Sequence, residues 1–179
     1  MGLHKSRVED GELMEKKQKI GFVAQVKAVL RDKNGKVKGV FDSAKQKLKD
    51  CMTNMGFAAL SALILTDVAK DAFDYIAIGT GTIAAAATDT ALQTEVKRKA
   101  GTGTRITKTV SNDTAQLVAT FSSGDGLSGT NAITEYGMLN AAAGGDLLLH
   151  EVDATAKNCN WGAGDTLEVT VTVQCKQGA

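Results

Sequence analysis

The residues whose types and spacing could do chemistry begin with a glycine-rich stretch in the middle of the chain. Residues 75–92 read YIAIGTGTIAAAATDTAL, where a short apolar run leads into Gly79-x-Gly81-x-x-Ala84. This spacing fits the turn that wraps a dinucleotide pyrophosphate, but that turn must open a helix within a parallel strand–helix–strand unit. Here apolar and polar residues alternate downstream of the motif, which is typical of antiparallel strands. We therefore interpret 79–90 as a compact loop of small residues that packs on backbone or on a neighbouring chain, and we expect no cofactor.

Candidate acid–base residues are few. The histidines are His4 and His150. His150 stands beside Glu151 in a predicted strand, where neighbouring side chains point to opposite faces, so no dyad partner is evident. We interpret Glu135, within ITEYG, as a hydrogen-bonded structural carboxylate rather than an acid catalyst. The sequence contains no GxSxG, HExxH or P-loop pattern, and it favours a protein that is not an enzyme.

The three cysteines, Cys51, Cys159 and Cys175, include no CxxC pair. A structural zinc site is therefore not expected. We interpret Cys51 as a buried, inert thiol. Cys159 is predicted to lie in an exposed loop, and Cys175 ends the last predicted strand. Because exposed thiols become oxidised outside the cell, we predict that Cys159 or Cys175 forms a disulfide, within the chain or to another chain.

Charge is distributed unevenly along the 179 residues, although the formal net charge is only +1. Residues 1–50 hold 13 Lys and Arg against 7 Asp and Glu, and the remainder is mildly acidic. A basic N-terminal third indicates either an arm that meets an acidic surface or a solvated leader. We take Lys16, Lys17 and Lys19, with Gly79 and Gly81 of the loop, as candidate assembly contacts. The overall balance argues against a nucleic-acid partner.

No segment is predicted to cross a membrane. The longest apolar stretch, GFAALSALIL at 56–65, has 10 residues, whereas a transmembrane helix needs about 20. No secretory signal pattern is found. We expect this stretch to be a buried helix and expect no membrane partner.

Three regions follow from the hydrophobic patterns. Residues 1–19 form a charged N-terminal arm. Within 20–72, residues 20–30 alternate like a strand, Asn34-Gly35 predicts a hairpin turn with positive φ at both residues, and residues 42–65 repeat at three- and four-residue steps. That repeat predicts one helix, or two broken near 54–56. Residues 73–179 form the main body.

The body is predicted to be mainly β. Strand patterns occur at 75–78, 105–110, 115–121, 132–139, 147–152 and 166–175, separated by Gly-rich turns. Such spacing indicates an antiparallel β-sandwich, jelly-roll-like, or a small barrel. The predicted core includes Leu117, Phe121, Leu167, Val169 and Val171. The lone tryptophan, Trp161, is expected to pack at a strand entry, with sugar stacking as the alternative.

Four strings carry a family resemblance: FDYIAIGTGTIAAAATDTALQTEV, SNDTAQLVATF, AITEYGMLNAAAGGDLLLHEV and GAGDTLEVTVTV, in that order. Together with the VKAVLRDKNGKVK hairpin and TNMGFAALSALIL, they resemble a family of small structural proteins of tailed bacteriophages, described as tail-fibre-like or head-decoration-like. The resemblance spans about residues 25–174. It implies a β-sandwich assembled in many copies on a virion, and it supplies no catalytic residues. Residues 1–19 and the cysteines depart from the common pattern.

The resemblance leads to three hypotheses. The first is a virion structural protein, preferably a head decoration or cement protein on the capsid lattice, with a neck, tail or baseplate part that attaches fibres as its alternative. The second is a carbohydrate-binding module on the virion surface that uses Trp161, Tyr136 and the Gly-rich loops. The third, an enzyme, lacks a supporting constellation. The expected partners are the major capsid protein or neck and tail proteins, and further copies of the chain. The expected location is the virion, assembled in the cytoplasm of the bacterial host.

Overall fold

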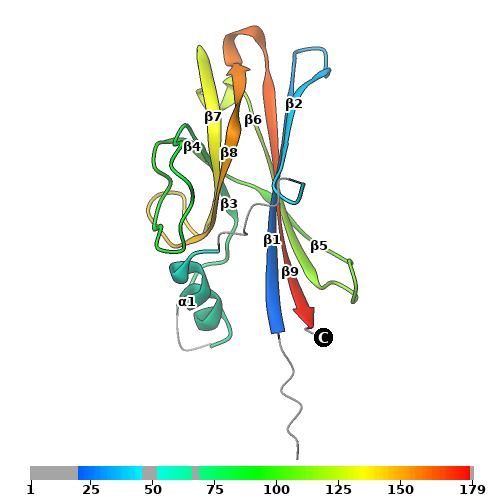
Figure 1. The fold of residues 1–179 in the computed structure, drawn as a ribbon, viewed down its shortest axis with the longest axis vertical. Helices are drawn as coiled ribbons and strands as arrows, with labels where there is room; N and C mark the ends of the chain where they lie inside the picture. Colours follow the sequence, from blue (N-terminus) through cyan, green and yellow to red (C-terminus); the bar gives the residue numbers. More distant parts are fainter. Residues whose placement is uncertain (1–19, 46–51, 66–68, 178–179) are drawn as a thin grey trace, which may run out of the picture.

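The computed structural model describes residues 20–45, 52–65 and 69–177, and these residues form an antiparallel β-sandwich (Figure 1). The mainly β fold predicted from the sequence is confirmed. The five-stranded sheet has the order β2 (Val37–Asp42), β1 (Ile20–Arg31), β9 (Thr166–Gln177), β6 (Thr114–Phe121), β5 (Thr102–Ile106). The four-stranded sheet has the order β4 (Glu95–Ala100), β3 (Tyr75–Gly79), β7 (Thr130–Leu139), β8 (Leu147–Asn160).

The core lies between the two sheets, where alternate residues of each strand point inward. The five predicted core residues are buried: Leu117, Phe121, Leu167, Val169 and Val171. Side chains of the other sheet meet them, including Ile76, Ile78 and Ile133. The clean alternation along β9 and β6 therefore predicted the packed face correctly.

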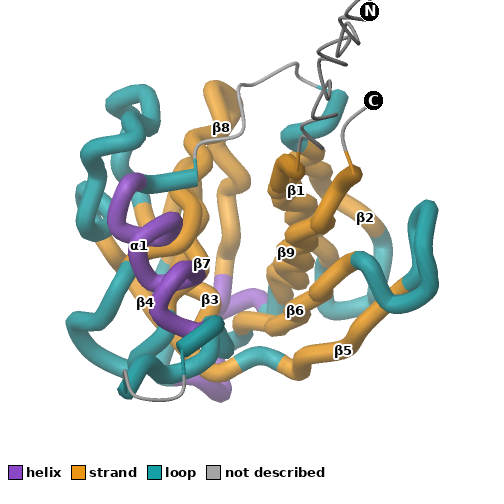
Figure 2. The backbone as a smooth tube through the Cα atoms, turned by 90° about the horizontal axis from the view of Figure 1, so that it is seen from below, coloured by secondary structure: helices purple, strands orange, loops and turns teal. Residues whose placement is uncertain are grey.

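The first and last described strands are partners. β1 pairs with β9 over its whole length, from Ile20 opposite Gln177 to Arg31 opposite Thr166. The sandwich thus takes two strands from 20–72, beyond the range 73–179 that the sequence pattern assigns to it. The pairing also places the start of β1 and the end of β9 at the same end of the molecule (Figures 1 and 2). The arm 1–19 lies outside the described residues.

The chain changes sheets at one glycine. β4 belongs to the four-stranded sheet and β5 to the five-stranded sheet, and Gly101 alone separates them. A Cβ at Gly101 would lie 2.8 Å from Leu117 Cγ, so the bend needs a residue without a side chain. β4 is a strand that the sequence patterns did not predict, because EVKRKA is mostly charged and lacks apolar alternation.

The helical prediction for 42–65 is wrong at its start. β2 continues to Asp42, and the described residues form one α-helix, α1 (Asn54–Leu63). The side chain of Thr53 accepts a hydrogen bond from Gly56 N at 2.9 Å and caps the helix. A Cβ at Gly56 would lie 2.5 Å from Leu148 O, so α1 packs directly on the backbone of β8. Cys51 lies outside the described residues.

The hairpin between β1 and β2 is confirmed, with a different turn. Gly35 has φ +81°, whereas Asn34 has negative φ. The Asp32 carboxylate accepts the backbone N–H groups of Asn34 and Lys36 at 2.8 and 3.0 Å, and this holds the longer loop in place. By contrast, the turn at Gly144 and Gly145, between β7 and β8, has positive φ at both glycines. No helix among the described residues is long and apolar enough to span a bilayer.

Candidate functional site

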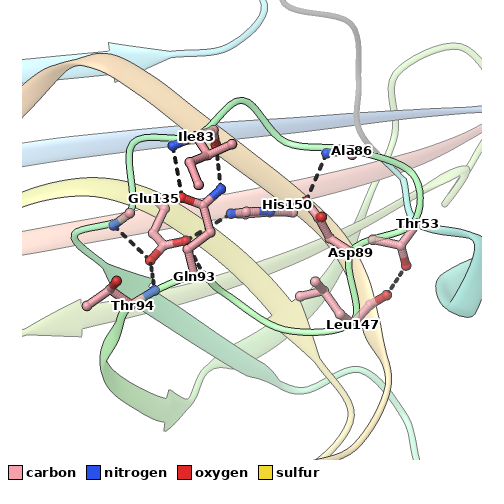
Figure 3. A network of polar contacts seen from close by, with 10 residues as sticks. Thr53, Ile83, Ala86, Asp89, Gln93, Thr94, Glu135, Leu147 and His150 are labelled. Carbon is pink, nitrogen blue, oxygen red and sulfur yellow. Dashed lines mark hydrogen bonds and ion pairs between the residues drawn. The ribbon is translucent and has the colours of Figure 1, made fainter.

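Residues 80–94 form the loop that joins β3 to β4, and one buried carboxylate binds both ends of this loop (Figure 3). Glu135 on β7 is 0% exposed. Its Oε1 accepts Gly81 N at 2.9 Å and Thr94 N at 2.7 Å, and its Oε2 accepts Gln93 N at 2.8 Å. A single side chain therefore ties the beginning of the loop to its end.

His150 on β8 connects this carboxylate to a second one. Its Nε2 lies 3.0 Å from Glu135 Oε2, and its Nδ1 lies 2.7 Å from Asp89 Oδ2 in the middle of the loop (Figure 3). A neutral imidazole has one N–H donor and can donate to one ionised carboxylate, whereas an imidazolium can donate to both. We call Asp89, His150 and Glu135 the carboxylate–histidine clamp.

The environment of Asp89 stabilises its charged form. Burial alone would raise the pKa of this carboxyl. The hydrogen bond from Ala86 N, at 2.8 Å, and the contact with His150 outweigh burial, and the pKa of Asp89 is lowered below its ordinary value. Asp89 is therefore ionised at neutral pH and faces the histidine as an anion.

Further tethers fix the rest of the loop. The Gln93 side chain accepts Ile83 N at 2.9 Å and donates to Ile83 O at 2.5 Å. Thr134 Oγ1 donates to Gly81 O at 2.7 Å, and Asn54 N of α1 donates to Ala87 O at 2.7 Å. The outward side of the held loop is apolar and small: Ile83 is 73% exposed, and Ala84, Ala86 and Ala87 are exposed. We call residues 82–87 the loop rim.

Gly79 and Gly81, the two glycines of the motif, leave the space that the Glu135 side chain and the loop backbone occupy. A Cβ at Gly79 would lie 2.3 Å from Glu135 Oε1, and one at Gly81 would lie 2.6 Å from Gln93 Cβ. Both glycines are buried, so the prediction that they are assembly contacts is wrong, because backbone must approach the carboxylate there. β3 is flanked by antiparallel β4 and β7, and a loop follows Gly81. This is not the parallel strand–helix geometry of a dinucleotide site.

The clamp is built to position the loop. Glu135 and His150 have no exposed side-chain surface, so a substrate cannot reach either group. The interpretation of Glu135 as a hydrogen-bonded structural residue agrees with these contacts. Within the described ranges, no three His, Cys, Asp or Glu side chains are grouped to hold a metal ion.

The sequence reading missed the partnership of His150 and Glu135, although a signal was present. The glycine hairpin at 144–145 makes β7 and β8 neighbours, and His150 stands opposite Gly137, two residues from Glu135 on the same face. Diagonal residues on one face are within reach of each other. Asp89 lies in the loop between β3 and β4, so the pairing of strands does not predict its position.

The aromatic side chains proposed to stack on sugars are inside the molecule. Trp161 is 1% exposed, and its Nε1 donates to Asn131 Oδ1 at 2.7 Å. Tyr136 is 0% exposed and stacks on Phe41 with ring centroids 5.1 Å apart. The carbohydrate hypothesis for these rings is therefore wrong, since neither offers a free face. Packing of Trp161 at a strand entry agrees with its place directly after β8.

The two described cysteines differ in access. Cys159 lies within β8, not in a loop, and is fully buried with Sγ 3.3 Å from Lys157 O. Burial, with the charge of Asp165, raises the pKa of Cys159 to about 12. The predicted exposure of Cys159 is therefore wrong. Cys175 is exposed, and both thiols are free in this chain. A disulfide to another chain thus remains a prediction for Cys175.

Lys16, Lys17 and Lys19, the other candidate assembly contacts, lie outside the described residues. Comparisons of the chain with protein-family models, with curated proteins and with solved structures gave no match. The resemblance to phage structural proteins therefore remains a prediction from the sequence, and the function has to be argued from the geometry.

Proposed function

We propose that this protein is a non-enzymatic structural component of a tailed-phage virion and that it decorates the capsid. The observation that carries the proposal is the carboxylate–histidine clamp, in which three contacting polar side chains hold an exposed loop of small apolar residues. A loop fixed before binding loses little entropy on contact, as suits a subunit that packs against protein. Glu135 and His150, which have no exposed side-chain surface, are not placed to act on a substrate.

A second surface supports assembly. Phe22 of β1 and Phe57 of α1 contact each other with ring centroids 6.3 Å apart, and they are 37% and 47% exposed. The end of α1 adds more exposed apolar side chains. We call this set the terminal patch: Phe22, Phe57, Leu63, Ile64, Leu65. Exposed apolar side chains that contact each other, as Phe22 and Phe57 do, mark protein contacts. Ile20 and Gln177, the first residue of β1 and the last of β9, pair near Phe22 at this end.

The location within the particle is tested by fractionation. Particles of the encoding phage are purified and separated into heads and tails, and the protein is quantified by mass spectrometry against the major capsid protein. A decoration protein is expected in heads, at a copy number comparable with the capsid protein. A few copies per particle, found with tails, would instead favour the neck, tail or baseplate alternative. Absence from purified particles would overturn the proposal.

Variants test whether residues 1–19 and the terminal patch dock the protein on the particle. Deletion of residues 1–19 is expected to leave a folded sandwich that no longer joins particles, if Lys16, Lys17 and Lys19 are docking contacts. Ile64→Ser, in the terminal patch, is expected to reduce incorporation. Val110→Ser is the matched control, since Val110 is 56% exposed in the β5–β6 loop. Normal incorporation of both the deletion and Ile64→Ser would place docking elsewhere on the sandwich.

A further inference from the structure

The sandwich has four edge strands, and three of them are blocked against pairing with another chain. Exposed edges invite such pairing unless bulges, charges or neighbours prevent it. β8 bulges, because residues 152–157 stand opposite 133–135, and the buried Lys157–Asp153 ion pair closes the bulge. β2 lies next to β8, with the Lys157 side chain against Gly39. β4 carries four charged residues in six.

Among the residues that the structure describes, none protects β5 in these ways. In the sheet order it has one neighbour, β6. Residues 102–105 are exposed, and Arg105 is the single charge in the strand TGTRI. The bend at Gly101 takes β5 away from the four-stranded sheet, and the strand forms a margin of the molecule in both views (Figures 1 and 2).

An apolar groove runs along the inner side of this strand. It has a volume of about 330 Å³ and lies between β5–β6 and the opposite sheet. Its lining includes Gly103, Arg105, Leu117, Phe73 and Met138. Gly103 pairs with Leu117 and Arg105 with Ala115, so Gly103 and Arg105 occupy the face that looks into the groove. An unpaired edge and an uncovered apolar face therefore coincide.

We propose that a second copy of this chain adds its β5 antiparallel to this β5, around a two-fold axis at Thr104, and joins the two five-stranded sheets. Antiparallel self-pairing about Thr104 sets Thr104 opposite Thr104 of the second copy and Arg105 opposite its Gly103. Thr102 then faces Ile106 of the second copy. The only charge of the strand meets a residue without a side chain and no like charge. The aliphatic stem of each Arg105 covers the groove beside the other copy's Gly103.

Strand addition of this kind gives an isologous dimer, in which the same surface is used twice. The place of the single charge is what selects a second copy as the partner, because in this register each Arg105 meets Gly103 and no like charge. The proposal goes beyond the proposed function: it names the self-contact and its register, and it holds whether or not the protein belongs to a virion.

The test exploits the two-fold axis. Thr104→Lys and Thr104→Glu each place like charges opposite each other, and sedimentation velocity is expected to show dimerisation at least about tenfold weaker than for the natural chain. An equimolar mixture of the two variants is expected to restore dimers as heterodimers. Thr120→Lys is the control, because Thr120 is exposed on β6 away from the edge, and it should dimerise normally. Circular dichroism confirms that each variant is folded.

A cross-link provides an independent measurement. In a chain with Cys51→Ser and Cys175→Ser, Thr104→Cys is expected to form a disulfide-linked dimer with oxidised glutathione, which is reduced to two glutathione molecules. Thr102→Cys does not face itself in this register and should not cross-link. A natural chain that stays monomeric up to about 100 μM overturns the proposal. So does a Thr104→Lys and Thr104→Glu mixture without heterodimers, or equal cross-linking at both positions.

Discussion

The carboxylate–histidine clamp is organised around a histidine that has no contact with water. His150 faces one carboxylate from each ring nitrogen, and its side chain is 0% exposed. Burying an ion is costly unless hydrogen bonds and opposite charges compensate. Here hydrogen bonds surround each group, because Glu135 also accepts three backbone N–H groups. The removal of one member should therefore cost more than the loss of one contact.

Glu135→Gln tests this dependence. The amide keeps one acceptor oxygen, while its NH₂ group would point at backbone donors or at His150. We expect the free energy of unfolding to fall by about 3 kcal/mol, as for the loss of one partner of a buried ion pair. Urea denaturation followed by circular dichroism measures this. Glu168→Gln on the outer side of β9 is the control, with an expected change within about 0.5 kcal/mol. Equal small losses for both variants would show that the clamp contributes little.

Thiol reactivity tests the burial of Cys159. Its pKa is raised to about 12 and its side chain is buried, so little thiolate forms and little reagent reaches it at pH 8. In a Cys51→Ser chain, iodoacetamide should label one thiol, Cys175, in the folded protein and two after denaturation. Mass spectrometry of tryptic peptides gives the count. Rapid labelling of Cys159 in the folded chain would show that β8 opens readily.

At the scale of elements, strands in which apolar and polar residues alternate were predictable. The charged strand β4 and the start of α1 were not. β6 and β9 alternate, and their core residues were predicted correctly. β4 has no apolar alternation, so only its pairing with β3 reveals it. The start of α1 depends on Gly56 reaching the backbone of β8, which is a tertiary contact that no periodicity encodes.

The candidate site was predictable only in part. Small residues at 79–87 indicated a loop with close backbone packing, and this holds at Gly79 and Gly81. The group that requires the close packing, Glu135, is 54 residues from Gly81. Contacts over that separation follow from the order of strands in the sheet, and sequence patterns give strand positions without giving that order.

Gly81→Ala tests the loop as an element. The added Cβ would lie 2.6 Å from Gln93 Cβ and 2.8 Å from Glu135 Cδ, so the clamp or the loop must shift. We expect a loss of about 1–3 kcal/mol in the free energy of unfolding, as for other overpacked positions. The control is Gly21→Ala on β1, where a Cβ would meet no atom within 4 Å. Thermal unfolding of both variants should separate them clearly, and equal melting temperatures would contradict the close packing described for the loop.

At the scale of the whole molecule, carboxylates join parts of the chain that are distant in sequence. Lys70 pairs with Asp146 at 2.8 Å, Lys99 with Asp125 at 2.5 Å and Lys38 with Asp165 at 2.5 Å. The hydrogen bond from Lys70 lowers the pKa of Asp146. For Asp125 and Asp165 burial raises the pKa. The hydrogen bonds from Lys99 and Lys38 together with backbone hydrogen bonds and nearby lysine charges outweigh burial, and both pKa values are lowered.

These shifts, with that of Asp89, predict instability in acid. A carboxyl with a lower pKa in the folded chain than in the unfolded chain binds its proton less readily when folded. Each such group therefore stabilises the fold above the unfolded pKa of about 3.9, and that contribution is lost as the pH falls through the lower, folded pKa. We expect the free energy of unfolding to decrease steeply below about pH 4, measured by urea denaturation at a series of pH values.

Asp89→Asn identifies the share of this acid sensitivity that belongs to the clamp. Asn does not titrate in this range, so the slope of unfolding free energy against pH below about pH 4 should become shallower by up to about 1.4 kcal/mol per pH unit. The variant should also be less stable than the natural chain at pH 7, where Asp89 is charged against His150. Asp71→Asn, at an exposed position before β3, serves as the control for removing a carboxylate. If Asp89→Asn and Asp71→Asn changed the acid slope equally, the clamp would not be the source, because of these two aspartates it is Asp89 that contacts the buried histidine.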